Sequence, residues 1–115
     1  MKSTYKRLFK VFGNIFNDIK IDKENEQFID LLKHENVRIE KIVSNGQCSP
    51  IDFWYEQDEN EFVILLKGEA ILEFENEDVH LKEGDFINIS SKQKHRVKYT
   101  SKNSTTIWLA VFYKD

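Results

Sequence analysis

The hydrophobic pattern from residue 37 to the end of the chain constrains the fold most. Apolar and polar residues alternate there in short segments rich in Val, Ile, Phe, Tyr and Thr, which is typical of β-strands. Turn residues such as Asn45-Gly46 and Gly84-Asp85 separate the segments. Many short strands at even spacing predict an all-β sandwich or barrel. The expected strands are residues 37–44, 53–57, 61–67, 69–75, 79–82, 86–89, 95–101 and 105–113.

Residues 1–36 follow a different pattern, in which apolar side chains recur at helical spacing. We expect helices within residues 1–20 and 24–33, and therefore an N-terminal helical arm over residues 1–36 and a β-domain over residues 37–115. The first ten residues carry several Lys and Arg residues and no acidic residue, so a basic amphipathic helix could lie on an anionic membrane. We favour docking of the arm on the β-domain or on a second subunit, because moderately amphipathic helices commonly pack against protein.

Composition excludes several classes of protein. The 115 residues are enough for one domain, and the 40% hydrophobic and 13% aromatic content argues against disorder. With 17 basic and 20 acidic residues the net charge is −3, which provides no electrostatic footprint for nucleic acid. The single Cys48 excludes an internal disulfide framework and a Cys-based zinc cluster. Because no signal peptide or membrane-spanning stretch stands out, we expect a cytoplasmic protein.

Three polar residues are placed to meet at one end of the expected barrel. Gln57 ends one expected strand, and Glu61 begins the next one after a short turn. His95 begins a later strand, and alternation puts Val97 and Tyr99 on its face. A carboxylate, an imidazole and an amide oxygen can together bind a divalent transition metal. The alternative is a hydrogen-bonded polar cluster without a metal, because buried polar groups need partners.

At these residues the sequence resembles the cupin superfamily. Glu61, then six residues, then Gly68 matches the end of the first cupin motif, GX5HXHX3-4EX6G. Gly84 followed eleven residues later by His95 matches the second motif, GX5PXGX2HX3N. Residues 37–113 are similar to the small single-domain cupins (the cupin type 2 conserved barrel), in the branch that lacks the HXH histidines. The resemblance implies a cupin-type double-stranded β-helix, or jelly-roll barrel, behind the short N-terminal helical arm.

The resemblance also implies a metal site. The cupin motifs make Glu61 and His95 metal ligands, and the two HXH positions fall on Tyr55 and Gln57 or on residues 54 and 56. Alternation favours the first alignment, in which Gln57 is the third ligand. The metal would be Zn, Ni, Mn or Fe, and the alternative is that no metal binds. Tyr55 would stand next to the ligands as a hydrogen-bond donor or acid. The expected ligand pocket is lined by Tyr55, Phe53, Tyr99 and Val63.

Two functions fit these residues. The first is a metal-dependent enzyme that acts on a small organic molecule, and the second is a non-catalytic ligand-binding or sensor module without a metal. The segment Phe62-Val63-Ile64-Leu65-Leu66 is apolar on both strand faces, so one face must be covered by another part of the chain or by a partner. We therefore also expect a homodimer.

Overall fold

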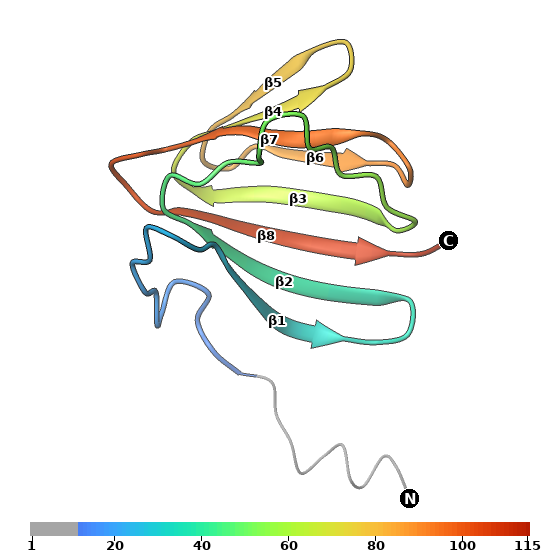
Figure 1. Ribbon diagram of the computed structural model, residues 1–115. Coiled ribbons are helices and arrows are strands. Elements are labelled where there is room, and N and C mark those ends of the chain that lie inside the picture. The colour runs from blue at the N-terminus through green and yellow to red at the C-terminus, as the bar shows by residue number, and fades with distance from the viewer. Residues whose placement is uncertain (1–11) are drawn as a thin grey trace, which may run out of the picture.

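The computed structural model describes residues 12–115, which form eight strands in two antiparallel sheets (Figure 1). The five-stranded sheet has the order β1-β2-β8-β3-β6, and the three-stranded sheet has the order β5-β4-β7. Figure 1 shows the smaller sheet stacked on one side of the larger one. The strands are β1 (Gln27–Lys33), β2 (Val37–Ser44), β3 (Asn60–Lys67), β4 (Ala70–Phe74), β5 (Asp78–Leu81), β6 (Phe86–Ile89), β7 (His95–Thr100) and β8 (Thr106–Tyr113).

The hydrophobic core lies between the sheets, on the inward face of alternate residues. In the central pair of strands, Val63 of β3 lies opposite Ala110 of β8, and Leu65 lies opposite Trp108. Leu72 of β4 belongs to the same buried cluster. Leu65 has no exposed surface, and burial of such a side chain stabilises the fold by about 1.5–3 kcal/mol. The all-β architecture expected from the alternation is confirmed, and β2 and β6 have the expected bounds.

The strand expected at residues 53–57 is wrong. Only Tyr55 pairs there, through a single antiparallel bridge to His95. The chain turns just before it, because the Phe53 N–H donates to the Pro50 carbonyl and Asp52 has a φ of 65°. A residue in the left-handed region ends an extended segment. The segment is therefore part of the loop between β2 and β3.

The helix expected at residues 24–33 is also wrong, because β1 occupies most of this range. β1 pairs with β2, with Phe28 opposite Ile42 and Asp30 opposite Glu40. The register shifts between Asp30 and Leu32, which indicates a bulge at Leu31. The bulge interrupts the two-residue alternation, and the resulting spacing of apolar residues imitates that of a helix.

No helix is present in the part of the arm that the structure describes. From residue 12 onward the chain forms turns, in which Asn14 is the organising residue: its carbonyl accepts the Asn17 N–H and its Oδ1 accepts the Phe16 N–H. Side-chain hydrogen bonds of this kind compete with helix formation. The rest of the helix expected within residues 1–20 lies outside the described residues. Among residues 12–115, no helix is long and apolar enough to span a membrane.

Candidate functional site

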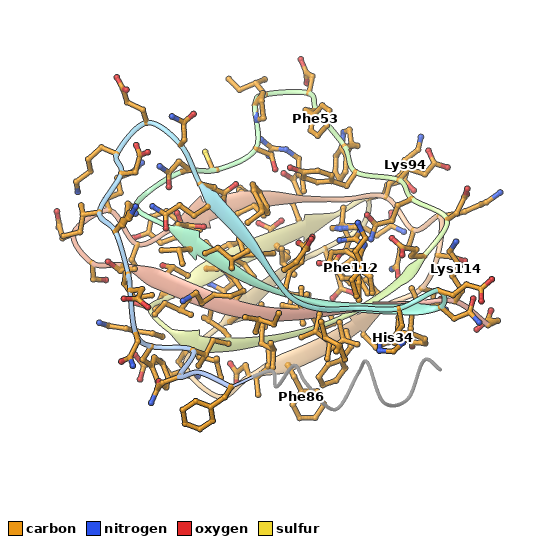
Figure 2. The ribbon with its side chains drawn as sticks, turned by 90° about the horizontal axis from the view of Figure 1, so that it is seen from below. His34, Phe53, Phe86, Lys94, Phe112 and Lys114 are labelled. Carbon is orange, nitrogen blue, oxygen red and sulfur yellow. The ribbon has the colours of Figure 1, made fainter. Side chains whose placement is uncertain are left out.

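A cavity of about 100 Å³ lies between the two sheets, at the end where β3 and β7 begin. In Figure 2, Phe112 on its wall is seen between the ribbons of the sheets. The apolar lining comes from both sheets and consists of Phe28, Ile42, Val63, Leu72, Ile89, Val97, Trp108 and Phe112. The polar lining consists of Glu26, Glu40, Tyr55, Gln57, Glu61 and His95. An apolar pocket with a few convergent polar groups is the usual form of a small-molecule site.

Of the three residues expected to bind a metal, Glu61 contacts both of the others. Its Oε1 accepts a hydrogen bond of 3.0 Å from the Gln57 amide Nε2 and lies 3.4 Å from His95 Nε2. Glu61 and Val63 face inward together because β3 alternates, and the loop before β3 places Gln57 beside them. Lys92 helps to hold that loop, since its N–H donates to the Gln57 carbonyl. The structure therefore brings all three side chains together at the cavity.

The His95 ring is fixed by a backbone contact. His95 is only 5% exposed, and its Nδ1 lies 2.9 Å from the Gln93 carbonyl oxygen, so Nδ1 carries a proton and donates it. In the neutral ring, Nε2 would then present a lone pair to the Glu61 carboxylate. Two acceptors at this distance repel each other, so the arrangement favours a proton or a cation between them.

The pKa of His95 agrees with this geometry. Burial of the ring lowers the pKa, but the hydrogen bond with Glu61, the Gln93 carbonyl and the charge of Glu61 together outweigh burial. The pKa of His95 is therefore raised above its ordinary value. Without a metal, the ring holds its second proton against Glu61 more strongly than a free imidazole would.

Tyr55 packs against the His95 ring. The two backbones exchange hydrogen bonds of 2.7 Å and 3.1 Å, and the two rings stack with centroids 5.8 Å apart. Burial raises the pKa of the Tyr55 hydroxyl, and the nearby charges of Glu26 and Glu61 raise it further. Tyr55 therefore stays protonated at neutral pH and is available as a hydrogen-bond donor beside the pair.

Two carboxylates of the cavity, Glu26 and Glu40, are absent from the set expected from the sequence. Glu26 accepts a hydrogen bond from the Ser44 hydroxyl, and Glu40 forms an ion pair with Arg38. Burial raises the pKa of Glu40, although the Arg38 charge opposes this shift. The alternation of β2 puts Glu40 on the same face as Ile42, and a charged residue on an inward face was the available signal. Glu26 gave no such signal, because its segment was expected to be helical.

Two of the four residues expected to line the pocket, Phe53 and Tyr99, are not in its lining, whereas Tyr55 and Val63 are. Phe53 is 45% exposed and packs edge-on against Tyr55. Tyr99 faces outward because β7 has an extra residue: Val97 lies opposite Leu72, but Tyr99 lies opposite Ile71. This bulge reverses the alternation after Val97.

Two antiparallel sheets around a cavity that contains Glu61 and His95 define a jelly roll of the cupin type. Residues 42–112 match the family described as "Cupin domain", so the chain belongs to the cupin family. A comparison with curated proteins finds no match.

Solved structures agree with this family. A candidate mannose-6-phosphate isomerase from Ralstonia eutropha JMP134 is 35% identical, with a TM-score of 0.87, and the match covers 90% of this chain and 98% of that chain. A cupin superfamily protein from Desulfitobacterium hafniense DCB-2 is 17% identical, with a TM-score of 0.71 and 84% of each chain covered. A protein from Thermus thermophilus is 16% identical, with a TM-score of 0.76, covering 91% of this chain and 98% of that one. The last two likenesses concern the fold alone.

The donor set at the cavity is smaller than that of a site with several histidines. Within residues 12–115, no group of three or more His, Cys, Asp or Glu side chains is arranged to hold a metal ion. Glu61 and His95 provide two donor atoms that face each other. The Gln57 amide directs its Nε2 at Glu61, so its oxygen can join them only after the amide group turns over. These three residues are the candidates for holding a metal in the cavity.

Proposed function

We propose that this cupin binds a small, hydroxyl-bearing organic molecule in the cavity between its sheets, and that Glu61, His95 and Gln57 hold a divalent transition metal there. The observation that carries the proposal is the distance of 3.4 Å between His95 Nε2 and Glu61 Oε1 inside a mostly apolar cavity. The candidate metals are Zn, Ni, Mn and Fe, for which imidazole and carboxylate ligands are suitable.

The geometry of the pair supports a metal. Ligand distances of about 2.0–2.2 Å to nitrogen and oxygen allow two atoms 3.4 Å apart to reach one ion without moving. The contact between Nδ1 and the Gln93 carbonyl fixes the tautomer in which His95 Nε2 is free to be a ligand. Backbone carbonyls commonly orient metal-binding histidines in this way.

A metal bound at this position supplies Lewis acidity, which polarises a carbonyl or hydroxyl oxygen of the ligand. The remaining residues of the cavity have separate tasks. The protonated Tyr55 donates a hydrogen bond to a ligand oxygen, and Glu40 is held ready to exchange a proton because burial raises its pKa. The apolar wall of Trp108 and Phe112 excludes water. Such a set is suited to the isomerisation of a hydroxycarbonyl compound, and the 35% identity to a candidate sugar-phosphate isomerase supports this reaction class.

A second candidate function is ligand binding without a metal. It is favoured by the hydrogen bonding within the cluster, because Glu61 Oε1 already accepts from Gln57 and lies beside His95. If His95 is protonated, these contacts satisfy the buried polar groups without a cation. In this function the cavity captures a small molecule and causes no reaction.

Metal titration of protein prepared without chelators separates the two functions. We expect MnCl₂, NiCl₂ or ZnCl₂ to raise the melting temperature of the wild-type protein, by an amount that corresponds to about 2.7 kcal/mol at a hundredfold excess over Kd. His95→Ala should abolish this shift, whereas His80→Ala, a change at an exposed position of β5, should keep it.

Each outcome has a distinct meaning. If His95→Ala binds metal as tightly as the wild type, the assignment of the site is wrong. If the wild type binds none of the metals but is stabilised by sugars or polyols, the metal-free function is correct.

A further inference from the structure

The charged residues in the cavity lining are mostly acidic. Glu26, Glu40 and Glu61 contribute carboxylates, and within residues 12–115 His95 is the one lining residue that can be cationic. Among the residues that the structure describes, no Lys or Arg lines the cavity. Even with a divalent cation bound at Glu61 and His95, three carboxylates outweigh its two positive charges. An anionic ligand would therefore meet like charge on the walls, which is costly where water is excluded.

Arg38 is ion-paired with Glu40 of the cavity lining, and it is fully engaged. Its guanidinium donates to the carboxylate of Glu40, donates at 2.9 Å to that of Glu59, and lies 4.0 Å above the Phe112 ring. Glu40 also faces Asp30 across the β1–β2 pair, so acidic residues outnumber Arg38 on this side. To bind an anion, Arg38 would have to give up one of two ion pairs.

The cations of the loop before β7 lie outside the cavity as well. Lys92 is exposed and is 3.9 Å from Asp58, and Lys94 is exposed on the surface in Figure 2. Neither residue belongs to the lining. A phosphate group held by these side chains would remain in solvent, where ion pairs contribute little.

We infer that the ligand of this cavity is a neutral, hydroxyl-bearing molecule, and that the cavity discriminates against its phosphorylated counterpart. The inference rests on the proposed function, since it concerns the charge of the molecule bound in the same cavity. Carboxylates accept hydrogen bonds from hydroxyl groups, and the aromatic wall of Phe28, Trp108 and Phe112 packs against their carbon skeleton. Both contacts are open to a neutral molecule.

Matched ligand pairs test the inference on the full chain loaded with Zn²⁺. The probes are mannose against mannose 6-phosphate, and glycerol against glycerol 3-phosphate. Binding is read from the indole N–H signal of Trp108, which lines the cavity; Trp54→Phe identifies this signal, because the chain has two Trp residues. We expect the neutral member of a pair to bind at least about tenfold more tightly than the phosphorylated member.

Two charge-matched variants locate the discrimination. Glu40→Gln removes a carboxylate of the cavity and one of the two ion pairs of Arg38, so the preference for the neutral member should fall several-fold. Glu83→Gln makes the same charge change in the turn between β5 and β6, where its amide oxygen can still accept the Gly68 N–H, and should leave the preference unchanged. If the preference for the neutral ligand fell equally in both variants, it would not originate from the carboxylates of the cavity, and the inference would be overturned.

The failure of the inference and the failure of the proposed function give different results. If both phosphorylated members bind as tightly as their neutral partners, or more tightly, the inference is overturned while small-molecule binding stands. If no member of either pair moves the Trp108 signal, the proposed function fails for hydroxyl-bearing ligands, and the inference falls with it.

Discussion

Replacing Glu61 by Gln should reverse the effect of His95 on the pH dependence of stability. In the wild type the pKa of folded His95 is raised above its ordinary value by Glu61 and Gln93, despite burial. The protonated ring therefore stabilises the fold at pH values below the unfolded pKa of about 6.5. This contribution is lost as the pH rises through the pKa of the folded state.

In Glu61→Gln the carboxylate charge is absent and burial of His95 dominates. Burial lowers the pKa of the ring, so protonation then favours the unfolded state and stability is lost as the pH falls below about 6.5. One proton changes the free energy of unfolding by at most about 1.4 kcal/mol per pH unit in each protein. The stability difference between wild type and variant should therefore be larger at pH 6 than at pH 8.

Urea unfolding monitored by Trp fluorescence between pH 5.5 and 8, with EDTA present to remove metal, measures this difference. Taking the difference between two proteins cancels the groups that they share, and His80→Gln is the control for a change at an exposed histidine away from the cavity. Parallel stability curves for the wild type and Glu61→Gln across this range would refute the coupling of Glu61 to His95.

Three further predictions concern the fold and the assembly. Gly84→Ala should cost about 1–2 kcal/mol of unfolding free energy, because φ is 91°; its Cβ adds no clash, since nothing lies within 4 Å. Gly68→Ala should cost about 1–3 kcal/mol more in urea unfolding, because its Cβ would lie 2.9 Å from the Thr106 Cα. Equal losses in the two variants would contradict this. Leu65→Ala should cost about 2–5 kcal/mol in the same assay, and a loss below about 1 kcal/mol would show that the site is not the packed core. Phe86 is 65% exposed on the outer face of the larger sheet, so we expect a homodimer there and a monomer for Phe86→Asp by light scattering; an unchanged mass for the variant would exclude this face.

The strands could be predicted from the sequence wherever one face is buried along their whole length. In β3, Val63 and Leu65 are buried and Ile64 between them is half-buried, so the strand appears in the sequence as a short apolar run bounded by turn residues. β1 could not be predicted, since its bulge at Leu31 is stabilised by pairing with β2, which is a contact between segments. The loop around Tyr55 was mistaken for a strand for a similar reason, as the positive φ of Asp52 leaves no trace in the alternation.

The candidate site was accessible from the sequence only in part. Glu61 and His95 stand at the starts of β3 and β7, before the bulge in β7, so strand starts and face parity locate them. Tyr99 was placed in the pocket because the bulge in β7 cannot be seen in the spacing. Alternation in β2 indicates that Glu40 faces inward with Ile42. Its place beside Glu61 depends on the sheet order, in which β2 and β3 lie on either side of β8, and that order follows from long-range pairing.

Anomalous X-ray diffraction from crystals of the protein soaked in MnCl₂ or ZnCl₂, recorded at the absorption edge of the metal, tests the central claim most directly. The proposed site predicts one strong peak in the cavity, within bonding distance of His95 Nε2 and Glu61 Oε1. Crystals that show metal elsewhere, or no peak beside these two atoms at saturating metal, would contradict the metal site at Glu61, His95 and Gln57.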